Sequence, residues 1–121
     1  MADAIRALAR TDLKGAIPAC LLVWTTLDSD DSGAPAEMVD YPDMTVAITG
    51  TFGVAGSITM QGSNDGTNYF ALTDPQGNAI TKTAAGMEII VEAPRYIRPL
   101  VTGGDGTTSL TATVLCRRVS R

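Results

Sequence analysis

The pattern that most constrains the fold of this chain is a two-residue period of apolar and polar side chains, broken by short turns. The period is clearest in residues 44–49 and 109–116, where every second residue is apolar and most of the others are Thr. Such a period places the apolar side chains on one face of an extended strand. The turns at 62–68, 74–78 and 103–106 are dense in Gly, Asn and Asp, which tolerate positive φ angles. About seven or eight short strands of this kind predict an all-β fold, an antiparallel β-sandwich resembling a jelly roll.

The first fifteen residues differ from the rest because their apolar side chains recur at helical spacing. Ile5, Leu8 and Leu13 would lie on one face of a helix. We therefore divide the chain into an N-terminal segment, residues 1–15, and a single β-sandwich domain, residues 16–121. The segment is expected to be a short amphipathic helix or an extended arm. It either packs on its own domain or reaches a neighbouring molecule, with these three side chains as apolar anchors.

The composition excludes most catalytic and metal chemistry. The chain contains no histidine, which removes imidazole-based catalytic triads and His-ligated zinc. Its two cysteines, Cys20 and Cys116, are too few for a Cys-based zinc site. Both lie in apolar runs, so we expect buried free thiols, with a disulfide as the alternative. We predict no enzymatic activity, no catalytic residue, no bound metal and no cofactor.

An acidic stretch, residues 28–43, contains six carboxylates and no basic residue. The spacing of Asp28 and Asp30 before a glycine resembles the first half of an EF-hand calcium loop. The twelfth position of such a loop would be Val39, where an EF-hand needs a bidentate glutamate. We therefore predict a solvated acidic loop, with a calcium site as the alternative. Asp28, Asp30 and Asp31 are candidate interaction residues.

Positive charge gathers toward the C-terminus, at Arg95, Arg98, Arg117 and Arg118, and no acidic residue follows Asp105. The net charge of −4 argues against binding to a nucleic-acid backbone, and no apolar run approaches the ~20 residues of a membrane span. We therefore expect neither nucleic acid nor membrane as a partner. The separated charges predict contact between the acidic loop of one copy and the basic edge of another, with ion pairs inside one chain as the alternative.

A set of turn and strand-end motifs between about residues 40 and 118 resembles small structural proteins encoded in the head-gene region of tailed bacteriophages. The motifs are MQGSNDGTNY (60–69), LTDPQGN (72–78), APRYIRP (93–99), TGGDG (102–106) and an alternating last strand that ends in two arginines. Members of this kind look like head decoration (cement) proteins. Such proteins bind the outside of the capsid shell as oligomers, often trimers, and stabilise it.

The resemblance implies a non-enzymatic virion protein with two partners, other copies of itself and the major capsid protein. It also implies a place on the capsid surface after synthesis in the bacterial cytoplasm. That agrees with an N-terminus that lacks the apolar core of a signal peptide. No fixed contact motif of the family can be matched to this chain, so the resemblance assigns no binding residue. The alternatives are a phage tail or head–tail connection subunit and a jelly-roll module that binds carbohydrate.

Overall fold

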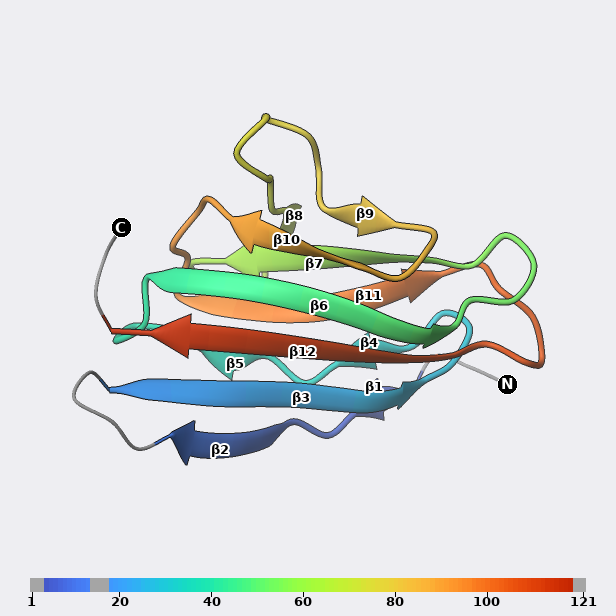
Figure 1. Cartoon of the computed structure of the whole chain (residues 1–121), viewed down its shortest axis with the longest axis horizontal. Helices are drawn as coiled ribbons and strands as arrows, with labels where there is room; N and C mark the ends of the chain where they lie inside the picture. Colours follow the sequence, from blue (N-terminus) through green and yellow to red (C-terminus); the bar gives the residue numbers. More distant parts are fainter. Residues whose placement is uncertain (1–3, 14–17, 119–121) are drawn as a thin grey trace.

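Two β-sheets packed face to face make up the computed structural model, which describes residues 4–13 and 18–118 (Figure 1). Sheet A contains the strands β1 (Ile5–Arg6), β4 (Ser32–Gly33), β5 (Ala36–Glu37), β7 (Ser57–Ser63), β8 (Phe70–Ala71), β9 (Thr81–Lys82) and β11 (Tyr96–Thr102). Sheet B contains, in spatial order, β10 (Gly86–Ile90), β6 (Asp43–Thr51), β12 (Ser109–Arg117), β3 (Ala19–Leu27) and β2 (Ala9–Leu13). The strand pairs are antiparallel apart from β1 with β4. The expected all-β, mostly antiparallel sandwich is confirmed.

The core lies between the two sheets and is built from the alternating residues. On β12, Leu110, Val114 and Cys116 are fully buried, whereas Thr111 and Thr113 point to the other side of the sheet. The same alternation holds on β6 and β3. The expected burial of both cysteines is found as well: Cys20 and Cys116 are free, buried and directly opposite each other on neighbouring strands. The period of two therefore identifies which side of sheet B forms the core.

Trp24 joins the two sheets at the centre of this core. Its side chain comes from β3 in sheet B, is fully buried, and donates a hydrogen bond from Nε1 to the carbonyl oxygen of Ala34 at 2.9 Å. The indole rests against Gly33 of β4, where an added Cβ would collide with both Trp24 and Pro99. Only a glycine leaves room for the ring at this point, and the bonded N–H lets the indole be buried without an unpaired donor.

Of the two forms predicted for the N-terminal segment, the helix is wrong over the residues described, and the extended form is found. Its residues form β1, which pairs in parallel with β4, and β2, which pairs with β3. The segment thus runs from the edge of sheet A to the edge of sheet B. A lone helix of this length is marginally stable in water, while each sheet edge offers unpaired backbone groups to an extended chain. The predicted boundary between residues 15 and 16 lies outside the described residues.

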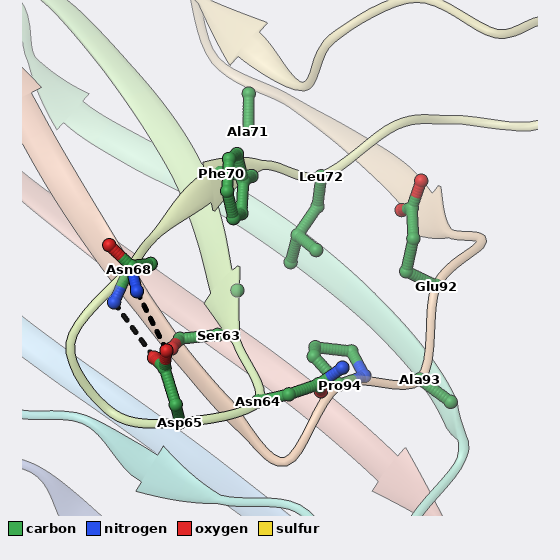
Figure 2. Close-up of a pocket in the computed structure, with 11 residues that line it drawn as sticks. Ser63, Asn64, Asp65, Asn68, Phe70, Ala71, Leu72, Glu92, Ala93 and Pro94 are labelled. Atoms are coloured by element: carbon green, nitrogen blue, oxygen red, sulfur yellow. Dashed lines mark hydrogen bonds between the residues drawn. The ribbon is translucent and has the colours of Figure 1, made fainter.

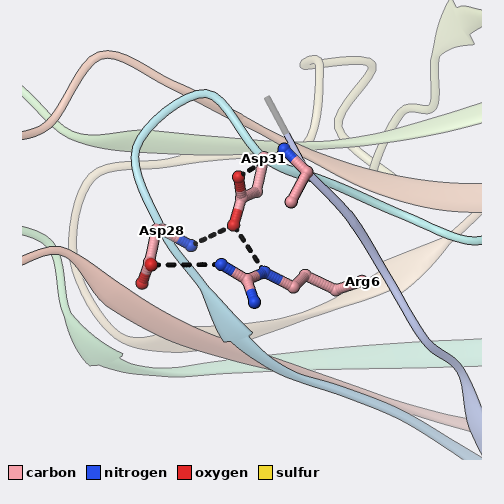
Figure 3. A network of polar contacts seen from close by, with 4 residues as sticks. Arg6, Asp28 and Asp31 are labelled. Carbon is pink, nitrogen blue, oxygen red and sulfur yellow. Dashed lines mark hydrogen bonds and ion pairs between the residues drawn. The ribbon is translucent and has the colours of Figure 1, made fainter. Parts of the chain in front are cut away.

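A buried carboxylate holds the start of this segment in place (Figure 3). Asp31 is fully buried and accepts hydrogen bonds from Nε of Arg6 at 2.7 Å and from the backbone N–H groups of Ala4 and Asp28, each at 2.9 Å. Burial alone would raise the pKa of Asp31, but the bonds from Arg6 and the two N–H groups outweigh burial and lower it. Arg6 also contacts the Asp28 carboxylate at 3.1 Å.

The tight contact between Trp24 and β4 predicts a strong effect of one added methyl group. We expect Gly33→Ala to lower the free energy of unfolding by about 1–3 kcal/mol, because the methyl group overpacks the core. Gly106→Ala is the matched control, since nothing lies within 4 Å of the added atom, and it should change stability by less than about 0.5 kcal/mol. Urea unfolding of the three proteins measures both values, and equal stabilities would contradict the packing described.

The Asp31 carboxylate predicts a pH-dependent contribution to stability. At about pH 7, Asp31→Asn should lower the free energy of unfolding by about 2–3 kcal/mol, because it removes charge-assisted hydrogen bonds from a buried site. The folded pKa is lowered, so this stability is complete above the unfolded value of about 3.9 and disappears as the pH falls through the folded value.

Urea unfolding at a series of pH values should therefore show the two proteins converging below about pH 4. Asp12→Asn is the control, because the Asp12 side chain is 80% exposed. If the difference in free energy of unfolding between wild type and Asp31→Asn stays constant across this pH range, the ionised carboxylate of Asp31 does not contribute to stability.

Candidate functional site

One end of the sandwich is hollowed where β7 ends and β11 begins. A hollow of about 540 Å³ lies between residues 62–72 and residues 92–94 (Figure 2). Phe70 and Leu72 line one side and Pro94 the other, and Phe70 is 70% exposed. The hollow is therefore open to solvent and offers apolar walls to whatever occupies it.

The two carboxylates beside this hollow are already engaged within the chain. Asp65 accepts bonds from the backbone N–H groups of Asn68 and Thr67, both at 2.8 Å, and these bonds lower the pKa of Asp65. Burial alone would raise the pKa of Glu92, but hydrogen bonds from the hydroxyl and N–H of Thr73, at 2.5 and 2.8 Å, outweigh burial and lower it. Both groups are ionised at neutral pH. Neither supplies the protonated acid that a two-carboxylate hydrolytic mechanism requires.

A second hollow of about 560 Å³ adjoins the first and shares Asn64, Ala93 and Pro94 with it. Val39, which is 69% exposed, lies on its far side. Arg95, one of the predicted interaction residues, also borders it, and Nε of Arg95 lies 3.1 Å from the Glu37 carboxylate. The two hollows together form a shallow groove, the end groove, and each half of it has an exposed apolar side chain, Phe70 in the first and Val39 in the second.

The carboxylates of the predicted acidic loop make contacts inside the chain. Asp28 and Asp31 bind Arg6, and Asp30 accepts a hydrogen bond from the backbone N–H of Gly103 at 3.1 Å. Among residues 4–13 and 18–118, no group of three or more His, Cys, Asp or Glu side chains could hold a metal ion. A role of these aspartates in contacts between copies stays a prediction.

The predicted basic residues come from both sheets, with Arg98 on β11 of sheet A and Arg117 on β12 of sheet B. Arg98 lies over the ring of Tyr69, 3.8 Å from its centroid, and donates a hydrogen bond to Gln61 at 3.0 Å. Arg117 lies 2.9 Å from the Asp43 carboxylate, whereas Arg118 is exposed. A basic edge that binds another copy also stays a prediction.

The predicted apolar anchors of the N-terminal segment differ in exposure. Ile5 is 73% exposed and Leu13 is 40% exposed, while Leu8 packs against the core.

A search of the described residues for a helix that could span a membrane finds none of sufficient length and hydropathy.

The outer side of sheet B is a surface that the sequence reasoning missed. The cross-strand register aligns its outward residues in two rows that each cross all five strands. The first row is Met87, Ala47, Thr113, Val23 and Ala9. The second row is Ile89, Thr45, Leu115, Leu21 and Thr11. We call these ten residues the neutral face, because none of them carries a charge.

The signal for the neutral face was present in the sequence. The polar half of each alternating strand holds Thr, Ala and aliphatic residues where a wetted strand normally also holds Lys, Glu or Arg. Reading the strands one at a time hides this, because the face appears only when the strand order is known. The first charges come at one end of the face, where Asp43 and Arg117 form their ion pair.

Comparison with known proteins gives a shared fold and no family. No family model and no curated protein matches the chain. Two of the similar solved structures have low TM-scores. Peruvianin-I, a cysteine peptidase from Thevetia peruviana latex, has a TM-score of 0.42 at 12% identity, and the match covers 93% of this chain and 63% of that chain. The Schizosaccharomyces pombe Cnp3 cupin domain has a TM-score of 0.41 at 10% identity, and the match covers 93% of this chain and 60% of that chain. The crystal structure of YomS, a protein derived from the SPBc2 prophage, matches with a TM-score of 0.58 at 12% identity. That match covers 87% of this chain and 98% of YomS, so the two chains share their fold over nearly their whole length.

Proposed function

We propose that this chain is a structural component of a tailed-bacteriophage particle, and that it decorates the outer surface of the head as a homo-oligomer in contact with the major capsid protein. The observation that carries the proposal is the fold shared with YomS, a prophage-derived protein, over 98% of that protein's chain. The phage-like turn and strand-end motifs between about residues 40 and 118 support the same origin. In this proposal the protein is not an enzyme, and its work is done by its surfaces.

The physical requirements of head decoration agree with the structure. A decoration protein stabilises a shell by adding non-covalent contact area between subunits, so it needs a stable body and exposed surfaces that exclude water on contact. The sandwich supplies the body. The neutral face and the end groove between Phe70 and Val39 supply two such surfaces, on different sides of the molecule. One can hold another copy while the other contacts the shell.

A carbohydrate-binding module is the second candidate, and one observation favours it. The exposed ring of Phe70 stands beside the amides of Asn64 and Asn68 in the first hollow, and aromatic rings with nearby polar groups are common in ligand pockets. Calorimetric titration with mono- and oligosaccharides separates the two candidates. Head decoration predicts no saturable binding, whereas binding that Phe70→Ala abolishes would favour the module.

The head-decoration proposal predicts where the protein is found in particles. Phage particles made by the genome that encodes the chain should be separated on a density gradient into heads and free tails, and each fraction analysed by quantitative mass spectrometry. We expect the chain in the head fraction at a fixed ratio to the major capsid protein, and antibodies against it should bind intact heads. Heads made without it should open at a lower temperature, because the added contacts are missing.

Other distributions have distinct meanings. The chain in the tail fraction alone would favour the tail or head–tail alternative and contradict head decoration. Its absence from every particle fraction would contradict a virion role altogether. Heads that contain the chain but bind no antibody would place it inside the shell and contradict decoration of the outer surface.

A further inference from the structure

The neutral face is unusual because the two sheets differ in the charge on their outer sides. An antiparallel sheet with one side on the core normally presents charged and polar side chains to water on the other. The outer side of sheet A follows this rule, with Arg98 and Gln61 paired across its central strands β11 and β7. The outward residues in the two rows of sheet B are Leu, Val, Ile, Met, Ala and Thr. Met87 is 67% exposed and Ile89 39% exposed on its edge strand β10.

The size of the neutral face is enough for a specific contact. The ten residues occupy about four residues of each strand, which at about 3.4 Å per residue and a strand spacing of about 4.8 Å covers about 330 Å². The uncharged pairs Thr49–Thr111 and Thr51–Ser109 continue the face on β6 and β12 and bring it to on the order of 450 Å². Two such faces would bury about 900 Å² in total, near the ~1,000 Å² at which specific protein interfaces begin. Threonine suits such a contact, because its methyl group packs and its hydroxyl can pair across the interface.

The chemistry of the face restricts what can cover it. A partner surface that carries charge would lose its hydration on contact and find no opposite charge among these ten residues. The partner must therefore be a flat, neutral surface of similar size. The chain itself has one: the same face on a second copy meets both requirements, and a two-fold axis brings identical faces together in a closed pair.

We propose that two copies of this chain pack through their neutral faces, sheet B against sheet B. The inference deepens the homo-oligomer part of the proposed function by naming the surface through which copies meet. It makes a dimer the basic unit, whereas the family resemblance implies a trimer. The end groove and the outer side of sheet A stay free for the shell.

The test is the solution mass of the full chain, by light scattering over a range of concentrations, for wild type and three variants. Wild type should reach twice the 12.6 kDa mass of one chain, with a dissociation constant on the order of micromolar for a contact of this size. Thr113→Lys puts an unpaired charge at the centre of the face and should weaken the dimer at least about 100-fold. Met87→Lys does the same on an edge strand, where lysine is well tolerated in the monomer.

Thr59→Lys is the matched control, because Thr59 is an outward threonine on β7 in the middle of sheet A. It should leave the dimer intact. Circular dichroism melts check whether the three variants are folded. If Thr113→Lys does not fold, Met87→Lys alone decides.

Each other result overturns the inference in a recognisable way. A wild-type monomer, or a dimer that neither neutral-face variant weakens, removes the face as a contact between copies. A trimer contradicts the two-fold arrangement, whether or not Thr113→Lys dissociates it. A wild-type monomer that binds purified heads, and loses that binding in Thr113→Lys, would assign the face to the shell and leave the proposed function standing. A wild type that dimerises but does not bind purified heads would support the dimer through the neutral face and contradict the proposed function.

Discussion

The contact between Trp24 and Gly33 is the constraint on which the arrangement of the two sheets depends. The indole fills the space between β3 of sheet B and β4 of sheet A, and its N–H is bonded to the backbone beyond Gly33. Because the ring rests directly on the backbone of β4, the distance between the sheets at this point is fixed by the thickness of one side chain. The two strands that this contact joins also bind the N-terminal segment, because β1 pairs with β4 and β2 pairs with β3.

The N-terminal segment closes the same side of the sandwich, which connects the core to the polar network. Asp31 comes just before β4, so the packing that places Gly33 also places this carboxylate where it meets Arg6 and the N–H of Ala4. A buried ion pair is weak support for stability in general, because desolvation offsets much of the attraction. Here the carboxylate also accepts two backbone N–H groups, and the pair fixes the parallel register of β1 against β4. Its structural role is to specify which extended conformation the segment adopts.

How much the sequence predicts depends on whether the deciding contact is local. The alternation in 44–49 and 109–116 correctly assigned inner and outer residues, because a single buried face imposes a period of two on each strand. The helical spacing of Ile5, Leu8 and Leu13 left a helix or an extended arm open, and the helix was wrong because sheet edges formed by distant residues decide the conformation there. The pairing of Arg6 with Asp28 and Asp31 was not foreseen for the same reason. Charge counts along the chain separated acidic and basic segments, but only the fold shows that members of each are paired within the molecule.

The neutral face shows how a property that no strand has alone arises from the order of the strands. Thr and aliphatic residues are good strand formers, so each strand of sheet B is unremarkable by itself. When the strands are aligned by their register, these residues form one surface on which the only side-chain groups that can hydrogen-bond to water are threonine hydroxyls. Such a surface is a hazard in a monomer, because a flat neutral sheet can associate without a defined geometry. The Asp43–Arg117 ion pair at one end of the face restricts where a flat partner can sit. In the proposed dimer, the uncharged rows would supply the contact, and the ion pair at their end would limit the geometries in which two copies can meet.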